Sequence, residues 1–297
     1  MNKAKPSYTP IRKLPDWLKI SLPKGNNYFR LKTLVEKHGL NTVCESASCP
    51  NVGSCWSAGT LTLMILGETC TRSCKFCDVP TGSVKPPRVE EPVEIAEMLS
   101  KLNLGYVVIT SVDRDDLPDG GAGIWAKTIR LIKKRNPYVK VEALIPDFKG
   151  EDFHVNKICQ AQPDVIAHNI ETVASLQSIV RPQCRYSWSL KVLKNISKNN
   201  IITKSNLMLG LGEKKREVVE TMRHLAEIGC QILSIGQYLR PSRNHLEVVE
   251  YIHPEVFSEY KSIGLSLGIK HVEAGPLVRS SYRADQQAQN LLNGLHS

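Results

Sequence analysis

The pattern of apolar and polar positions is regular from residue 61 onward. Short apolar runs alternate with longer segments in which apolar residues recur every three or four positions. The short runs are typical of buried strands and the longer segments of amphipathic helices. The predicted strands are residues 61–66, 106–112, 139–145, 165–170, 203–209 and 231–236. The predicted helices lie near residues 93–102, 124–135, 153–161, 188–197, 216–228 and 254–267.

This alternation predicts an α/β fold built from parallel βαβ units. Six units are too few to close an eight-stranded barrel, and the strands are apolar enough to be covered on both faces. A partial (β/α)6 TIM-type barrel fits this count, and a doubly wound sheet fits it nearly as well. We expect the barrel at residues 61–270, between an N-terminal extension (1–60) and a C-terminal extension (271–297).

The composition of the chain indicates where in the cell this protein is expected. The chain has 297 residues, 41% of them hydrophobic, and no apolar run long enough to span a bilayer or to form the core of a signal peptide. We therefore expect a cytoplasmic protein with no membrane partner. Asp16, the prolines and the scarcity of serine also argue against an organelle transit peptide.

The formal charge of +10 is concentrated at the N-terminus, where residues 1–40 contain nine Lys or Arg and two acidic residues, a net charge of +7. Such a basic arm suits contact with nucleic acid or with an acidic protein, and it equally suits a solvated leader.

Six of the nine cysteines form two short runs, each with three thiols. The first run is Cys44, Cys49 and Cys55, and the second is Cys70, Cys74 and Cys77. In a reducing compartment, clustered cysteines indicate metal or redox chemistry more than disulfides. Three thiolates are one fewer than the four that close a zinc or iron–sulfur site, which leaves room for an outside ligand. The alternatives are zinc modules that lack a fourth ligand, or incidental thiols.

The second run follows the first predicted strand, so it lies at the end of the sheet where βα folds carry their functional loops. Its spacing suits a [4Fe–4S] cluster with three irons held by thiolates and one left open. Phe76, between the last two cysteines, would pack on a planar ligand there. The remaining thiols, Cys159, Cys184 and Cys230, are isolated in the sequence, and we expect them to be buried and inert.

The motif CTRSCKFC resembles the C-x3-C-φ-C signature of the radical S-adenosylmethionine (radical SAM) superfamily, in which φ is aromatic. The resemblance implies that the amino and carboxylate groups of S-adenosylmethionine (SAM) chelate the open iron. It further implies that reductive cleavage of SAM gives a 5′-deoxyadenosyl radical. Members usually have the six-unit open barrel, so the resemblance favours that fold over the doubly wound sheet.

Nearly the whole chain resembles the lipoyl synthase family of this superfamily. The matching segments are NTVCESASCPNVGSCW, SVDRDDLPDGGA, HNIETV, NLMLGLGE, GQYLRPS and GPLVRSSY. The resemblance implies that Cys44, Cys49 and Cys55 hold a second, auxiliary [4Fe–4S] cluster whose fourth ligand is a serine of RSSY. The register favours Ser281, with Ser280 as the alternative. A serine oxygen is a harder donor than a thiolate and is more easily released from a soft cluster. On the bare sequence, a helix N-cap is the commoner role for such a serine.

The resemblance also implies contacts with SAM beyond the cysteines. The expected residues are Gly120 and Gly121 after the second strand, Asn169 and Glu171 after the fourth, and Arg240 after the sixth. The alternative for Arg240 is a salt bridge at the rim of the barrel. For the neighbouring His168, a hydrogen-bonded core residue is the more common role.

The implied activity is the insertion of two sulfur atoms, at C6 and C8, into an octanoyl group on a lysine of a lipoyl carrier domain. The auxiliary cluster would be consumed as the sulfur source. The implied partners are octanoylated E2 subunits of 2-oxoacid dehydrogenases and the glycine cleavage H protein, with a reductant such as ferredoxin or flavodoxin. We expect a monomer with no nucleic-acid partner. The alternatives are a two-cluster electron carrier, a zinc-stabilised nucleic-acid module, or a related radical enzyme such as a methylthiotransferase.

Overall fold

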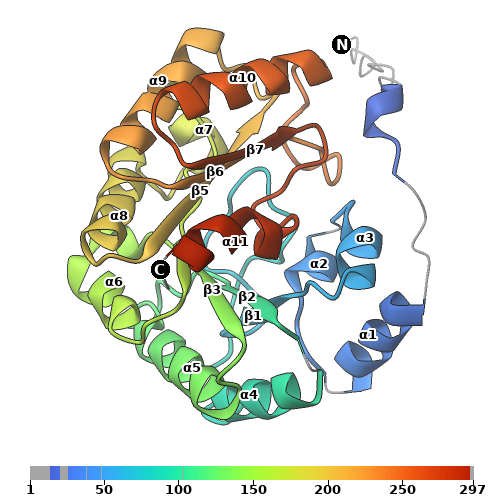
Figure 1. The fold of residues 1–297 in the computed structure, drawn as a ribbon, viewed down its shortest axis with the longest axis vertical. Coiled ribbons are helices and arrows are strands. Elements are labelled where there is room, and N and C mark those ends of the chain that lie inside the picture. The colour runs from blue at the N-terminus through green and yellow to red at the C-terminus, as the bar shows by residue number, and fades with distance from the viewer. Residues whose placement is uncertain (1–13, 21–25, 38, 48, 103, 295–297) are drawn as a thin grey trace, which may run out of the picture.

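A single parallel sheet of seven strands forms the centre of the computed structural model, which describes residues 14–20, 26–37, 39–47, 49–102 and 104–294 (Figure 1). The strands join in chain order, and every neighbouring pair is parallel. They are β1 (Thr62–Ile65), β2 (Tyr106–Ser111), β3 (Lys140–Leu144), β4 (Val165–Ala167), β5 (Ile202–Leu209), β6 (Ile232–Gln237) and β7 (His271–Gly275).

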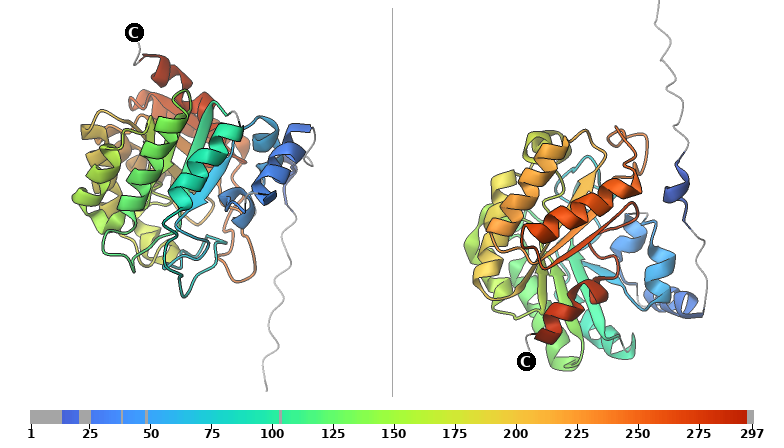
Figure 2. Two further views of the ribbon diagram at one scale, coloured as in Figure 1. Left: turned by 90° about the horizontal axis from the view of Figure 1, so that it is seen from below. Right: turned by 45° about the horizontal axis from the view of Figure 1, so that its top comes forward.

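Helices cover the outer face of this curved sheet (Figures 1 and 2). The main ones are α4 (Glu91–Leu102), α5 (Ala122–Arg135), α6 (Asp152–Cys159), α8 (Tyr186–Lys198), α9 (Lys215–Glu227) and α10 (Pro254–Ser266), and the short α7 (Gln177–Val180) precedes α8. In α9, the buried Val218, Met222 and Leu225 repeat at helical spacing and face the core. Six strands are each followed by a covering helix, which confirms the predicted partial barrel.

Strand β7 was not predicted. It pairs in parallel with β6 and lies within residues 271–297, for which an extension outside the barrel was predicted. The predicted count of six strands is therefore one too low. The segment His-Val-Glu-Ala-Gly has only Val272 fully buried, so its pattern carried too weak a strand signal.

The N-terminal extension packs beside the free edge of β1. It contains α1 (Asn26–Lys37), α2 (Val43–Ser46) and α3 (Val52–Ser57). The Met64 amide donates to the Asn41 carbonyl at 2.8 Å, and Trp56 of α3 is completely buried. An exposed strand edge presents unpaired backbone groups, so this contact protects β1 while it brings the first cysteine run against the sheet.

The C-terminal helix α11 (Ala284–Gly294) covers the opposite end of the barrel from the cysteine loops (Figure 1). Its buried Ala284 and Ala288 pack with Tyr106, Val165 and Ile202, each the first residue of a strand. With the amino ends of the strands covered, the carboxyl ends are left for a functional site.

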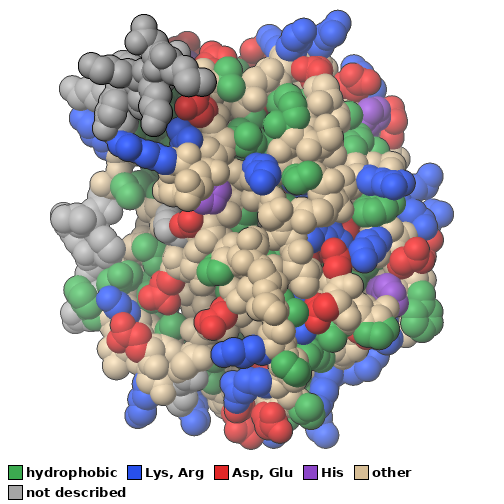
Figure 3. Space-filling view, turned by 180° about the vertical axis from the view of Figure 1, so that it is seen from behind, with side chains coloured by type: hydrophobic (Ala, Val, Ile, Leu, Met, Phe, Trp, Pro, Cys, Tyr) green, Lys and Arg blue, Asp and Glu red, His purple; other side chains and the backbone are tan. Residues whose placement is uncertain are grey.

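The surface shows no single-sign patch on the face seen in Figure 3, where basic and acidic side chains are mixed. Much of the basic arm, including Lys3, Lys5, Arg12 and Lys13, lies outside the described residues. In the part of the arm that is described, Lys19 pairs with Asp16 at 2.5 Å. Among the described helices, none is long and apolar enough to cross a membrane.

Candidate functional site

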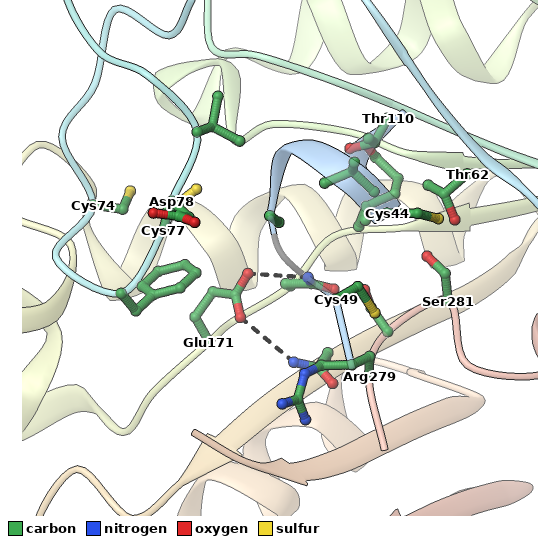
Figure 4. A pocket seen from close by; sticks show the side chains of 18 of the residues that line it. Cys44, Cys49, Thr62, Cys74, Cys77, Asp78, Thr110, Glu171, Arg279 and Ser281 are labelled. Atoms are coloured by element: carbon green, nitrogen blue, oxygen red, sulfur yellow. Dashed lines mark hydrogen bonds between the residues drawn. The ribbon is translucent and has the colours of Figure 1, made fainter. Parts of the chain in front are cut away.

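Both cysteine runs line one cavity of about 570 Å³ at the carboxyl ends of the strands. This volume lies within the range of small-molecule and cofactor sites. The predicted residues in its wall are Cys44, Cys49, Cys55, Cys70, Cys74, Phe76, Cys77, Asn169, Glu171, Arg240, Ser280 and Ser281. In Figure 4, Cys74 and Cys77 lie on one side of the cavity, Cys44, Cys49 and Ser281 on the other, and Glu171 between them.

The second run forms one loop that is closed at its base. The Cys70 amide donates to the Pro80 carbonyl at 2.8 Å, and the Gly82 amide donates back to the Cys70 carbonyl at 3.2 Å. At the tip, His245 bonds through Nε2 to the Cys77 carbonyl at 2.9 Å. The three thiols are thus held in place by local backbone contacts after β1.

A buried arginine within this loop anchors it to the barrel. Arg72 is 2% exposed, and its guanidinium donates to both carboxylate oxygens of Asp115 at 2.8 and 2.9 Å. It also pairs with Asp147 at 2.8 Å. Burial, the largest single cause, would raise the pKa of Asp147, but the Arg72 charge and further charges and hydrogen bonds together outweigh it, and the pKa is lowered. These carboxylates compensate the buried charge and fix the loop on strands β2 and β3.

The thiols of this loop have raised pKa values. Burial raises the pKa of Cys77 to about 11 and is also the largest cause of the raised pKa of Cys70. For Cys74 the largest cause is a hydrogen bond with Cys184, followed by burial. Without metal these groups are therefore protonated near neutral pH, and binding of a metal would displace their protons.

The first run is assembled from two short helices. Cys44 lies in α2 and Cys55 in α3, and the Cys49 amide donates to the Cys44 carbonyl at 3.1 Å. Burial raises the pKa of Cys55 to about 11 and is the largest cause of the raised pKa of Cys44. Burial is also the largest cause of the raised pKa of Cys49, and the positive charge of Arg279 acts in the opposite direction.

The segment that follows β7 carries the serine pair to these cysteines. The Asn51 side chain donates to the Leu277 carbonyl at 2.6 Å, across 226 residues of sequence. Gly236 in β6 leaves room for the segment, because a Cβ there would lie 2.0 Å from the Val278 carbonyl oxygen. In Figure 4 Ser281 lies on the same side of the cavity as Cys44 and Cys49, and its hydroxyl points toward Cys44. Helix α11 begins at Ala284, so neither Ser280 nor Ser281 is at its N-cap position.

Glu171 lies in the space between the two runs. It is held at a φ of 67°, in the left-handed region, and its carboxylate accepts from the Asn169 and Asn206 amides at 3.0 and 3.5 Å. Burial raises its pKa. The Oδ1 atoms of Asn169 and Asn206 are buried and have no hydrogen-bond partner. A buried acceptor without a partner is costly, so this wall is suited to a ligand that donates hydrogen bonds.

Gly120 and Gly121 are not among the residues that line the cavity, and their contact with a cofactor stays a prediction. They form the turn before α5, where a Cβ on Gly120 would meet Phe148 at 2.8 Å and one on Gly121 would meet Leu66 at 2.5 Å. Both have positive φ values, which favour glycine. The residues of this connection that reach the cavity are Val112 and Asp113, just after β2, and burial raises the pKa of Asp113 to about 6.

Arg240 lines the cavity, but its guanidinium is largely engaged within its own loop. Nε donates to the His245 carbonyl at 2.9 Å, Nη2 to the Arg243 carbonyl at 2.6 Å, and Nη1 to Glu247 at 3.4 Å. The position of Arg240 therefore fits the alternative, a salt bridge at the rim of the barrel, better than it fits a guanidinium that is free to bind the carboxylate of a cofactor. His168 is a hydrogen-bonded core residue as expected, bonded to the Ile145 carbonyl and to Ser189, each at 2.9 Å.

Cys184 was missed as a neighbour of this site. It was expected to be isolated and inert, yet its sulfur accepts from Nη1 of Arg72, within the cysteine loop, at 3.2 Å. Its distance from the cysteine loop along the chain gave no signal of this contact. Cys159 and Cys230 are buried, as expected.

The residues present fit the groups that the resemblance implies. Two sets of three thiols with an oxygen donor beside one set match iron–sulfur ligation more closely than a closed zinc site. The unpartnered amide oxygens match the donor groups of a nucleoside with an amino group. Among the described residues, no three His, Cys, Asp or Glu side chains are close enough to hold a single metal ion.

Comparison with known proteins gives two family matches. The model of the Radical SAM superfamily matches residues 64–225. A second model, the N-terminal domain of lipoyl synthase of the radical SAM family, matches residues 2–49.

Curated relatives match nearly the whole chain. The lipoyl synthase of Treponema denticola is 53% identical over 272 residues, which cover 92% of this chain and 94% of that protein. The lipoyl synthase of Flavobacterium johnsoniae is 50% identical, covering 92% and 95%. The mitochondrial lipoyl synthase of Nematostella vectensis is 48% identical, covering 94% and 96%.

Solved structures share the fold at low identity. Streptococcus suis SuiB bound to S-adenosylmethionine has a TM-score of 0.58 at 11% identity, covering 84% of this chain and 56% of that chain. Methylornithine synthase has a TM-score of 0.53 at 11% identity, covering 79% and 81%.

Proposed function

The chain belongs to the lipoyl synthase family of the radical SAM superfamily, and we propose that it inserts two sulfur atoms, at C6 and C8, into an octanoyl group attached to a lysine of a lipoyl carrier domain. It is an enzyme that uses SAM and [4Fe–4S] clusters. The family assignment replaces the alternatives of an electron carrier, a nucleic-acid module and a methylthiotransferase.

One observation carries the proposal for the site. Two sets of three cysteines line the walls of a single cavity, with Ser281 beside only one of them. Two equivalent electron-transfer clusters would each need a fourth thiolate. A cluster held by one set would keep an open iron for a cofactor, and a cluster held by the other set would have an oxygen donor as its fourth ligand. The two sets are therefore suited to different functions.

Cys70, Cys74 and Cys77 would hold the cluster that binds SAM, and Cys44, Cys49, Cys55 and Ser281 the cluster that supplies sulfur. When bound, the first cluster and SAM supply a 5′-deoxyadenosyl radical, and the second cluster supplies sulfur atoms. The octanoyl chain would lie between the two walls.

The protein side chains would bind and orient the reactants. Asn169, Asn206 and Glu171 offer buried hydrogen-bonding groups to the ribose or amino group of SAM, and Phe76 offers an apolar face. Arg72 and its carboxylates keep the loop rigid. Burial of these groups excludes water, which protects a reactive species from side reactions.

Ser281 would close the second site weakly. An alkoxide or hydroxyl oxygen binds a soft cluster less firmly than a thiolate does, so the ligand can leave as the cluster is consumed. Ser280 also lines the cavity and is the alternative ligand.

The substrates would be octanoylated carrier domains of E2 subunits and of the glycine cleavage H protein, and ferredoxin or flavodoxin would supply electrons to a monomeric enzyme. Residues 1–60 and 271–297 would serve the auxiliary cluster. Nine free cysteines suit a reducing compartment, which supports a cytoplasmic location.

The basic arm would dock an acidic carrier domain. Reversal of four of its basic residues should raise KM for the carrier domain but not for a short octanoyl peptide. Equal effects would contradict docking.

The function is tested with anaerobically reconstituted protein, SAM, a strong reductant and an octanoylated lysine peptide. Mass spectrometry should find the peptide with two added sulfur atoms, together with 5′-deoxyadenosine. Cleavage of SAM without any sulfur in the peptide, under conditions where both clusters are loaded, would contradict the proposal.

A further inference from the structure

A tight turn carries the serine pair that lies beside the first cysteine run. The Tyr282 amide donates to the Arg279 carbonyl at 3.0 Å, which makes Ser280 and Ser281 the two central residues of a four-residue turn. The next residue, Arg283, has a φ of 47°, in the left-handed region. A residue other than glycine keeps this conformation only where its surroundings enforce it, so the link between the turn and α11 must be held by other contacts.

The chain before the turn is anchored on the side of the first cysteine run. The Asn51 side chain donates to the Leu277 carbonyl at 2.6 Å, and the Val278 amide donates to the Gly275 carbonyl at 3.1 Å. These contacts fix where the segment enters the turn. A turn that is held at its entry alone can still rotate, so the direction of the serine hydroxyls depends on a second anchor at its exit.

Gln287 provides this second anchor. It is the fourth residue of α11 and is 2% exposed, and its Nε2 atom donates to the Tyr282 carbonyl at 2.5 Å. Its Oε1 atom accepts from the hydroxyl of Ser234, a fully buried residue of β6, at 3.1 Å. The side chain therefore bridges the last residue of the turn and the sheet. Since a carbonyl only accepts and the Gln287 amide has one donor group, the two contacts also fix which way the amide points.

Leu292 anchors the same helix in a different way. It is 8% exposed and belongs to the apolar cluster of Ala284 and Ala288 at the amino ends of the strands. This contact holds α11 on the barrel but lies toward the far end of the helix from the turn. The packing of α11 and the position of the turn thus depend on different side chains, which allows them to be tested separately.

We propose that Gln287 is a positioning residue, whose bridge between the turn and β6 keeps the Ser281 hydroxyl directed toward Cys44 (Figure 4). The inference rests on the proposed function, in which Ser281 is the fourth ligand of the auxiliary cluster. Gln287 is not among the described residues that line the cavity, so it acts only through the turn.

The bridge matters because the ligand that it positions is weak. A serine oxygen binds a soft cluster less firmly than a thiolate does, so its binding is sensitive to the cost of ordering the turn. Loss of one hydrogen bond of ordinary strength should favour the displaced turn about fivefold. A cluster whose fourth ligand is displaced should lose iron faster, before the substrate can take up its sulfur.

The first measurement follows hydrogen exchange in the reconstituted full-length protein by mass spectrometry. It compares wild type with Gln287→Met, which keeps the length of the side chain without its hydrogen bonds, and with Leu292→Ala as the matched control. The amides of residues 277–283 should exchange about fivefold faster in Gln287→Met and at the wild-type rate in Leu292→Ala. If Gln287→Met does not load its clusters, Ser234→Ala, which removes the far end of the bridge alone, takes its place.

The second measurement asks whether Gln287 acts through Ser281. Iron release to a chelator, product per loaded cluster and SAM cleavage are compared in Gln287→Met, Ser281→Ala and the double variant. Gln287→Met should release iron about fivefold faster and form about fivefold less product, with SAM cleavage unchanged. The double variant should match Ser281→Ala in all three quantities, because the bridge then has no ligand left to position.

Unchanged exchange and iron release in Gln287→Met would overturn the inference and leave the proposed function intact. Equal changes in Leu292→Ala would do the same, because a loosened helix rather than a lost bridge would then be the cause. Additive losses in the double variant would mean that Gln287 acts independently of Ser281 and would also rule the inference out. A Ser281→Ala protein that forms product at the wild-type rate would overturn the assignment of Ser281 and the inference together.

Discussion

The two cysteine sites have the same number of thiols but are built in different ways. The site after β1 comes from one loop of eight residues, Cys70 to Cys77, closed by its own backbone hydrogen bonds. The site beside β1 takes its cysteines from α2, α3 and the turn between them, and its serine from a segment that contacts α3 across 226 residues of sequence. A local site can stay intact through many cycles, whereas a composite site with a weak ligand can open.

Their electrostatic surroundings differ as well. Arg72 and Arg181 lie behind the loop site, balanced by Asp113, Asp115 and Asp147. At the composite site, the positive charge of Arg279 acts directly on Cys49. The loop site thus has paired arginine and aspartate charges behind it, whereas an arginine acts on one of the thiols of the composite site.

The largest expected effect is on sulfur insertion and SAM cleavage when one cysteine of each site is replaced. Cys49→Ala should abolish sulfur insertion, by about a hundredfold or more, and leave SAM cleavage nearly intact, because only the composite site loses a ligand. Cys74→Ala should abolish both activities. Product and 5′-deoxyadenosine are measured in the same reaction. Loss of both activities in Cys49→Ala would contradict the division between the sites.

The next effect concerns Ser281, the proposed fourth ligand of the composite site. Ser281→Ala should reduce product formation about tenfold, since loss of a ligand or its support has effects of this size. Ser280→Ala is the matched control and should have a smaller effect. The comparison is made by product per loaded cluster. The reverse ranking would move the ligand role to Ser280.

A smaller effect should follow when the serine segment is displaced indirectly. Gly236→Ala places a methyl group against the Val278 carbonyl, and overpacking of this kind costs about 1–3 kcal/mol in free energy of unfolding. Product formation should fall severalfold while SAM cleavage is retained. Gly105→Ala, where a Cβ meets nothing within 4 Å, is the control. Equal loss of both activities in Gly236→Ala would show that the segment does not serve the composite site alone.

The last prediction concerns stability rather than activity, and it tests the buried His168 beneath the cavity. Burial lowers the pKa of His168 to about 4 from its usual 6.5. Below pH 6.5 the unfolded chain binds a proton at His168, whereas the folded chain binds it only near pH 4. The free energy of unfolding therefore decreases as the pH is lowered from 6.5 to 4. From pH 7 to 5 the His168 contribution should fall by about 2 kcal/mol.

Urea unfolding of wild type and His168→Gln at the two pH values measures this difference. The variant is expected to be less stable than wild type at pH 7. The difference between their free energies of unfolding should be smaller by about 2 kcal/mol at pH 5. The exposed His253→Gln is the control and should keep the wild-type dependence. A gap that does not change with pH would contradict the assignment to His168.

Much of the fold was predictable because its elements follow local rules. The six buried strands and their amphipathic helices gave strong periodic signals, and the partial barrel followed from their alternation. Strand β7 was missed because it is short and mostly half-exposed, so pairing with β6 rather than its own pattern determines it.

The site was predictable where its residues are close in sequence. The spacing of the cysteines indicated both runs, and the structure brings both to one cavity. Gly120 and Gly121 form the turn before α5, and the sequence does not separate such a turn from a ligand-binding loop because both use glycine. Cys184 and Asp113 reach the site through tertiary contacts, which no local pattern records.

The central claim is that the Cys44, Cys49 and Cys55 cluster supplies the sulfur while the Cys70, Cys74 and Cys77 cluster does not. The most direct test loads the enzyme with sulfur-34 sulfide, removes free sulfide, and allows a single turnover with octanoylated peptide and SAM. The account predicts that both sulfur atoms in the product are sulfur-34, that at most one product forms per chain, and that no product forms in a protein lacking Cys44, Cys49 and Cys55. Product with unlabelled sulfur, or labelled product from that triple variant, would contradict it.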